Sequence, residues 1–112
     1  MLTWIDASQD DVVVLNVTGR LDGVGAPELE RHCSELIRGG TTRLLLDIAE
    51  VDYISSAGLR SLLVIAKGMK SANGSLLLCC LSPMVREVME ISGFDKILNV
   101  ATDRDTALSS LS

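Results

Sequence analysis

The sequence predicts an α/β domain in which a mostly parallel sheet with one antiparallel edge strand packs against about four helices. Two observations indicate this class. Short apolar runs typical of buried strands alternate along the chain with segments of helical periodicity. The first two strand-like runs are also separated by only a short polar turn, which suits an antiparallel hairpin. Because 112 residues provide one hydrophobic core, we expect a single domain over residues 1–112.

The N-terminal third is expected to form a hairpin followed by a helix. Residues 2–7 pair with the β-branched run 12–17. Pro27 is placed well for the first turn of the helix. Apolar residues then recur at helical spacing until Gly39 and Gly40 end the run.

The remaining two thirds alternate strand and helix, which gives the order β-β-α-β-α-β-α-β-α. Continuous apolar runs predict strands covered on both faces, and a short strand near the C-terminus completes the sheet. Ser82 before Pro83 is expected to cap one helix, and the residues from Thr102 to Asp105 resemble a capping box for the last. The expected strands are 43–48, 75–80 and 97–100. Two of the expected helices end near Ser71 and at Gly93, and the last carries Ala107, Leu108 and Leu111.

Composition argues against nucleic acid and membrane partners. The net charge is −5, and Trp4, Tyr53 and Phe94 are the only aromatic rings, so neither a phosphate-binding surface nor a base-stacking platform is expected. The first residues are acidic without a basic signal region, and no apolar stretch approaches the roughly 20 residues that cross a bilayer. We therefore expect a cytoplasmic protein without membrane insertion.

The three cysteines, Cys33, Cys79 and Cys80, do not suggest a disulfide framework or a zinc site. Their number is odd, two are adjacent in an apolar run, and no CxxC spacing occurs. All three are expected to be small buried apolar residues.

Acidic residues cluster near the centre of the chain. Asp47, Glu50 and Asp52 fall within six residues of one another, close to the junction that follows the predicted strand. Acids on a surface loop are usually solvated, so we expect no bound metal ion and no cofactor.

The segment VDYISSAGL, residues 51–59, places two adjacent hydroxyls at a junction between strand and helix. Ser55 or Ser56 is expected to be the N-cap of the helix, which contributes about 1 kcal/mol. Loops at the carboxyl ends of parallel strands also gather functional sites. A phosphate at this position would meet free backbone N–H groups and the positive end of the helix dipole, so phosphorylation could block a partner without unfolding the domain.

A stand-alone serine hydrolase is the catalytic alternative, and the sequence gives it little support. Neither Ser55 nor Ser56 has the flanking glycines of a nucleophile elbow. His32 is the only histidine and lies off the apolar stripe of its predicted helix, so it is expected to be solvated. No Walker or dinucleotide-binding string occurs. We therefore expect no catalytic residues and no enzyme activity.

Three separated blocks resemble the STAS family, the domain of bacterial anti-sigma factor antagonists. The resemblance runs nearly the full length of the chain and includes the characteristic sequence around the two serines. The blocks are Thr18–Asp22 with the following Ala26–Leu29, Leu46–Leu59, and Leu81–Val88 with Ile91–Ile97.

This resemblance implies a role in partner switching. In the family, the unphosphorylated antagonist binds an anti-sigma factor that is also a serine kinase of the histidine-kinase-like ATPase fold. The kinase phosphorylates the antagonist, which dissociates, and a PP2C-type phosphatase restores the unmodified form. Alignment on Gly58–Leu59 places Ser56 at the phosphoacceptor and Ser55 where the family often has aspartate. The implied partner-binding residues are Asp22, Ser55, Ser56, Gly58 and Leu59.

Two further expectations accompany this resemblance. The chain could instead serve as a non-phosphorylated adaptor subunit of a lipid-transport or stress-sensing complex, because that use needs the same fold. The expected oligomeric state is a monomer or a weak dimer.

Overall fold

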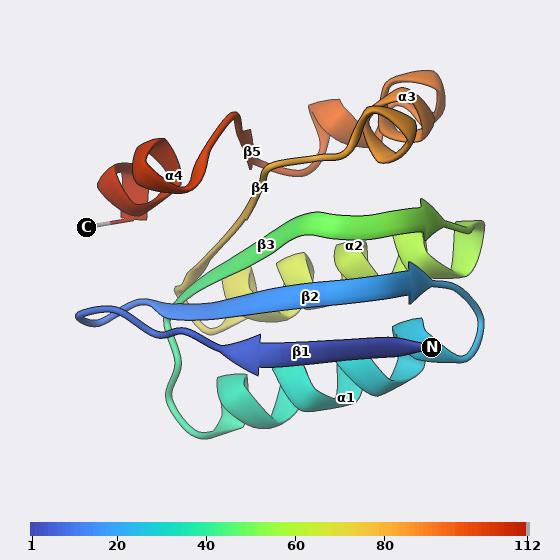
Figure 1. The fold of residues 1–112 in the computed structure, drawn as a ribbon. Helices are drawn as coiled ribbons and strands as arrows, with labels where there is room; N and C mark the ends of the chain where they lie inside the picture. The colour runs from blue at the N-terminus through green and yellow to red at the C-terminus, as the bar shows by residue number, and fades with distance from the viewer. Residues whose placement is uncertain (112) are drawn as a thin grey trace.

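The computed structural model describes residues 1–111, and its elements follow the predicted order (Figure 1). A 3-10 helix, η1, is the one addition among them. The bounds are β1 Leu2–Asp6, β2 Val13–Leu21, α1 Gly25–Arg38, β3 Arg43–Ile54, α2 Ser56–Ser71, β4 Ser75–Cys79, α3 Pro83–Ser92, η1 Phe94–Lys96, β5 Val100–Ala101 and α4 Arg104–Leu111.

The strands form one sheet with the order β1-β2-β3-β4-β5. β1 pairs antiparallel with β2, and every other neighbouring pair is parallel. This confirms the predicted mostly parallel sheet with an antiparallel edge. Right-handed crossovers of the parallel strands place the connecting helices against the sheet, which explains why helices and strands alternate in the sequence.

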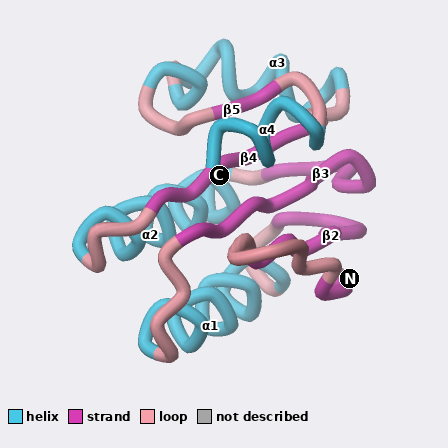
Figure 2. The backbone as a smooth tube through the Cα atoms, turned by 90° about the vertical axis from the view of Figure 1, so that its left-hand side faces the viewer, coloured by secondary structure: helices cyan, strands magenta, loops and turns pink. Residues whose placement is uncertain are grey.

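Helices cover both faces of the sheet (Figure 2). Leu44 and Leu46 of β3 belong to the larger core with residues of α1, α2 and α3. Leu45, on the opposite face, packs in a smaller core with Ala107 and Leu111 of α4. The central part of β3 is therefore buried on both faces, as its continuous apolar run predicts.

Several predicted boundaries are wrong, and the largest difference lies in β2 and β3. β3 continues to Ile54 because it stays paired with β2 through two register shifts as far as Leu21. Asp47, Glu50 and Asp52 consequently lie in a strand, where a surface loop was predicted. Smaller differences are that α1 begins at Gly25 and that the last strand is Val100–Ala101.

Ser82 occupies the predicted N-cap position of α3, and Pro83 is the first helical residue, but the serine hydroxyl does not cap the helix. The Ser82 hydroxyl instead donates to the carbonyl oxygen of Val51 at 2.9 Å. The bond joins the start of α3 to β3, so the hydroxyl contributes to tertiary packing.

α4 is held on the sheet by a buried polar contact at its first residue. The guanidinium of Arg104 donates to the carboxylate of Asp47 through Nε at 3.1 Å and through a terminal nitrogen at 2.9 Å. The same guanidinium donates to the side-chain oxygen of Asn16. Asp103 accepts from the Thr106 N–H at 2.8 Å at the start of the helix, and this bond lowers the pKa of Asp103. The capping residue therefore lies within the predicted segment, but it is Asp103 and not the Thr102 of the expected capping box.

Replacing Arg104 with alanine is expected to lower the free energy of unfolding by about 1–3 kcal/mol, because Asp47 would keep its half-buried carboxylate without an ionic partner. Urea denaturation of the variant measures this change. Arg86→Ala is the matched control, since Arg86 is exposed on α3 and its loss should change stability by no more than about 0.5 kcal/mol. Equal losses in the two variants would contradict the anchoring role of Arg104.

Candidate functional site

The C-terminal ends of β2 and β3 lie side by side at one edge of the sheet (right-hand side of Figure 1). The helices α1 and α2 begin at this edge, and the N-terminus of the chain also lies there. Leu21 and Ile54, the last residues of the two strands, are register partners. Asp22 directly follows one and Ser55 directly follows the other. Two sequence blocks separated by more than thirty residues are thus brought together, as expected for loops at the carboxyl ends of parallel strands.

Ser55 holds the loop in place and caps α2. Its backbone N–H donates to the carbonyl oxygen of Leu21 at 2.9 Å, and its hydroxyl donates to the same oxygen at 3.3 Å. The hydroxyl also accepts from the Gly58 N–H at 3.2 Å. The predicted N-cap is confirmed and is Ser55, whose hydroxyl is occupied within the fold.

Ser56 differs from its neighbour in exposure and in bonding. It is the first residue of α2, and its side chain is exposed. Within residues 1–111 its hydroxyl has no hydrogen-bond partner. The amides of Ser56 and Ala57 precede the capped Gly58 amide and belong to the first turn, where N–H groups have no intrahelical acceptor. An anion on the Ser56 hydroxyl would therefore lie at the positive end of the helix.

Asp22 has a structural role that the sequence-based interpretation missed. One carboxylate oxygen accepts from the N–H groups of Val24 at 3.1 Å and Gly25 at 2.9 Å, at the start of α1. The other oxygen lies 3.7 Å from Nε of Arg20. The hydrogen bonds from Gly25 and then Val24 lower the pKa of Asp22. The signal in the sequence was an aspartate followed by glycine, because an aspartate side chain in a turn commonly accepts from the backbone N–H two residues later.

Arg20 also connects the two strand ends through a cation–π contact. Its guanidinium lies 4.0 Å from the ring centroid of Tyr53, its register partner in β3. The contact is exposed on one side and contributes roughly 0.5–1 kcal/mol. Together with the Asp22 ion pair, it links the loop after β2 to the last residues of β3.

Gly58 and Leu59 are buried, in contrast to Ser56. A Cβ atom at Gly58 would lie 2.4 Å from the carbonyl oxygen of Leu21 and 2.8 Å from the side chain of Ile54. Glycine therefore allows α2 to begin directly against the end of β2. Any influence of these two residues on a partner would act through the position of the loop, because their own atoms lie in the interior.

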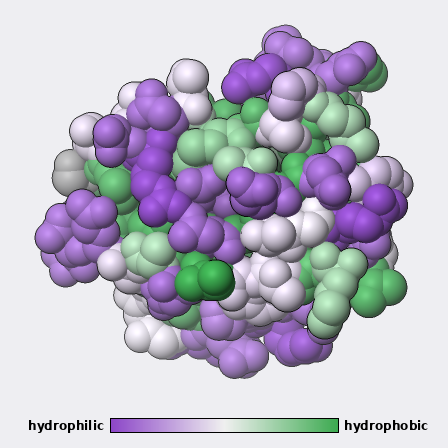
Figure 3. Space-filling model, viewed as in Figure 1, coloured by the Kyte–Doolittle hydropathy of each residue, from purple (hydrophilic) through white to green (hydrophobic). Residues whose placement is uncertain are grey.

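Apolar side chains are exposed beside these polar groups. Val24 is 76% exposed and Met1 is 96% exposed. Figure 3 shows apolar residues at the right-hand edge, the end of the molecule that carries the N-terminus in Figure 1. We name the residues Asp22, Val24, Tyr53, Ser55 and Ser56 the carboxyl-end surface. It combines the exposed apolar side chain of Val24 with polar groups from both strand ends.

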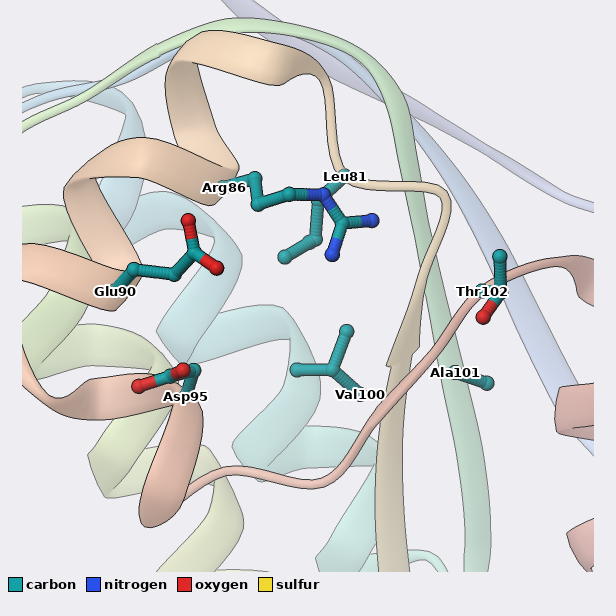
Figure 4. A pocket seen from close by; sticks show the side chains of 7 residues that line it. All are labelled: Leu81, Arg86, Glu90, Asp95, Val100, Ala101 and Thr102. Atoms are coloured by element: carbon teal, nitrogen blue, oxygen red, sulfur yellow. The ribbon is translucent and has the colours of Figure 1, made fainter.

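A recess of about 110 Å³ lies next to the C-terminal ends of β4 and β5 (Figure 4). Arg86 extends across it, and the carboxylates of Glu90 and Asp95 stand on the side of α3 and η1. Typical small-molecule pockets measure roughly 300–1,000 Å³. This recess is too small for a nucleotide or a comparable substrate.

Asp22 and His32 are both poorly suited to act as a general base for the two serines. Asp22 uses its carboxylate for backbone hydrogen bonds, and a lowered pKa weakens it as a base. His32 was expected to be solvated; it is partly exposed, and its ring packs beside Trp4 with the centroids 5.1 Å apart.

Replacing Gly58 with alanine is expected to lower the free energy of unfolding by about 1–3 kcal/mol, since the added methyl group collides with the Leu21 carbonyl. Gly68→Ala in the same helix is the control. There the new methyl group meets only the end of the Ile37 side chain, at 3.2 Å, and the helix gains from alanine. Thermal unfolding should separate the variants, and equal behaviour would contradict the close packing at Gly58.

Comparison with known proteins agrees with this arrangement. The STAS domain family model matches residues 4–107. BtrV of Bordetella bronchiseptica, provisionally named an anti-sigma factor antagonist, is 42% identical over 98 residues, which cover 88% of this chain and 84% of BtrV. The anti-sigma-B factor antagonist of Staphylococcus aureus is 26% identical, covering 83% of this chain and 86% of that protein.

The fold agrees as well. The crystal structure of an anti-sigma factor antagonist from Mycobacterium paratuberculosis superimposes with a TM-score of 0.88 at 25% identity, covering 99% of this chain and 94% of that one. The predicted resemblance is confirmed by sequence and by architecture: the chain belongs to the STAS domain family.

Proposed function

We propose that this protein is an anti-sigma factor antagonist controlled by phosphorylation of Ser56. Its unphosphorylated form binds an anti-sigma factor that is also a serine kinase, phosphorylation of Ser56 releases the partner, and a PP2C-type phosphatase restores binding. The names of BtrV and the S. aureus relative support the antagonist role. The observation that carries the phosphorylation step is the exposed, unbonded hydroxyl of Ser56 beside the bonded hydroxyl of Ser55, as described for residues 1–111.

The two serines differ in what phosphorylation would do to the fold. The Ser55 hydroxyl donates to the carbonyl oxygen of Leu21 and accepts from the Gly58 N–H. A phosphate on Ser55 would remove the proton of the first bond and place a dianion against that carbonyl oxygen. A phosphate on Ser56 breaks neither bond. A kinase that modifies a folded antagonist therefore has an accessible acceptor at Ser56, and the modified domain keeps its architecture.

Phosphorylation of Ser56 is well suited to blocking a partner. It adds nearly two negative charges to a surface that includes the exposed apolar side chain of Val24. An interface that buries Val24 would have to desolvate the phosphate, which is unfavourable without a cationic partner. Within this chain, two features stabilise a phosphate on Ser56. The start of α2 carries the positive end of the helix dipole, and its first turn has no acidic residue. Arg60, one turn later in the same helix, supplies a positive charge.

The proposed activity is binding, without turnover by the chain itself. A serine hydrolase would need a base near Ser56, and Asp22 and His32 are engaged in other contacts. No helix within residues 1–111 combines the length and apolarity that crossing a membrane requires. The net charge of −5 also argues against direct binding to nucleic acid.

Phosphate is expected on Ser56 in protein isolated from the cells that produce it. Trypsin cleaves after Arg43 and Arg60, so one peptide, Leu44–Arg60, carries Ser55, Ser56 and Tyr53. Fragmentation of this peptide by mass spectrometry assigns the modified residue. A Ser56→Ala strain is the control and should lose the modification.

Two results would contradict this part of the proposal. One is phosphate on Ser55 that persists in the Ser56→Ala strain. The other is an unmodified peptide both in growing and in stressed cells, which would favour the constitutive adaptor role.

Variants of the two serines should separate stability from binding. Ser55→Ala is expected to lose about 1 kcal/mol of folding stability, because the α2 cap is removed. Ser56→Asp should change stability by less than about 0.5 kcal/mol, because an acidic residue is favourable at a helix start.

Ser56→Asp should nevertheless weaken binding to the kinase partner at least about tenfold, whereas Ser56→Ala should bind but resist release by ATP. Urea denaturation and calorimetry measure the two effects, and a Ser56→Asp variant that binds like wild type would refute the switch.

A further inference from the structure

Cys79 and Cys80 place their two sulfur atoms in contact, 3.1 Å apart. Adjacent residues of an extended strand point to opposite faces of the sheet, so neighbouring cysteines in a strand would normally be separated. Here β4 ends at Cys79, and Cys80 adopts a positive φ of 66°, in the left-handed region that side chains other than glycine rarely occupy. This backbone conformation breaks the alternation and coincides with the pairing of the sulfurs.

A carboxylate completes the cluster. Asp47 of β3 is the register partner of Cys79 in β4. One oxygen of Asp47 and the two sulfurs all lie within 4.8 Å of one another. Cys79 is buried, whereas Cys80 is partly exposed, which corrects the expectation that all three cysteines are buried and gives the cluster access to solvent.

The surroundings hold Asp47 in place. One of its oxygens accepts from Arg104, and the other accepts from the Ala49 N–H at 3.1 Å. Arg104 is bonded in turn to Asn16. Such outer contacts orient ligands in protein metal sites. Oδ2 of Asp47 accepts both bonds from Arg104, whereas Oδ1 accepts only the Ala49 bond and keeps a lone pair for a further contact.

We propose that Cys79, Cys80 and Asp47 form a binding site for a thiophilic divalent cation, for which Zn²⁺ is the probe. Two thiolates and one carboxylate are a donor set that zinc accepts, with a water molecule in the fourth position. Tetrahedral bonds of about 2.3 Å would separate the sulfurs by about 3.8 Å. The sulfur–sulfur distance must therefore increase by about 0.7 Å when the ion binds, and rotation of the partly exposed Cys80 side chain provides this increase.

Charge balance favours a divalent ion. Asp47 and Arg104 form an ion pair with no net charge. Cysteine binds a metal ion as the thiolate, so each of the two cysteines must give up its thiol proton when the ion binds. Binding exchanges two thiol protons for one M²⁺ ion and forms two metal–sulfur bonds, which leaves the half-buried cluster neutral and releases two protons to solvent. Affinity must therefore fall as the pH is lowered.

The test is a titration of the full chain with Zn²⁺, after reduction with a phosphine and removal of metals with a chelator. A competing chromophoric chelator reports affinity and stoichiometry, and a weakly buffered indicator reports proton release. Binding of one ion per chain with release of close to two protons is expected. Co²⁺ in place of Zn²⁺ should give the charge-transfer absorption of cobalt–thiolate bonds.

Cysteine variants assign the site. Cys80→Ala should weaken Zn²⁺ binding at least about 100-fold, and Asp47→Asn about tenfold. Cys33→Ala is the matched control, because Cys33 is a buried thiol in the core of the opposite face and should not affect affinity. Circular dichroism shows whether each variant is folded, and Cys80, being partly exposed, tolerates replacement better than Cys79.

Two outcomes would overturn the proposal. One is equal Zn²⁺ affinity of wild type and folded Cys80→Ala. The other is binding that depends on Cys33 as strongly as on Cys80. Both are independent of phosphorylation at Ser56, so the metal site and the proposed switch can fail separately.

Discussion

The carbonyl oxygen of Leu21 is the point on which the arrangement of the carboxyl-end surface depends. It accepts the backbone N–H and the hydroxyl of Ser55, and Gly58 packs against it too closely for a side chain. These contacts fix the end of β2 against the start of α2. Asp22, one residue beyond Leu21, caps α1 at the same edge. Two helix starts and two loops are thereby held in one geometry, and Ser56 is left exposed.

The two faces of the sheet serve the protein differently. The face covered by α1, α2 and α3 holds the larger core and sets the position of the carboxyl-end surface. The other face carries the short α4, and there the polar residues Asn16, Asp47 and Arg104 replace part of the apolar packing. The Cys79–Cys80 pair lies beside this polar contact. A cation bound there would act on the C-terminal part of the domain, away from the Ser56 hydroxyl.

The order of elements could be predicted because strands and helices here differ in periodicity, and the apolar runs of β3 and β4 match strands buried on both faces. Contacts distant in sequence could not be predicted in the same way. The extension of β3 to Ile54 depends on pairing with β2, and the bond from Ser82 to Val51 spans two elements. The choice of Ser55 as cap required the position of Leu21. The sequence predicted Cys79 and Cys80 only as small buried apolar residues, and the contact between their sulfurs depends on the backbone conformation at Cys80.

The most direct test of the switch is the affinity of the anti-sigma factor kinase from the same organism for two forms of this chain, measured by calorimetry. One form is unphosphorylated, and the other carries phosphate on Ser56 at full occupancy. Both should show the same thermal unfolding temperature within a few degrees, because the phosphate breaks no contact of the fold. The phosphorylated form should bind at least about tenfold more weakly, since the phosphate must be desolvated at the interface. Equal affinity of the two forms, with both folded, would contradict the account.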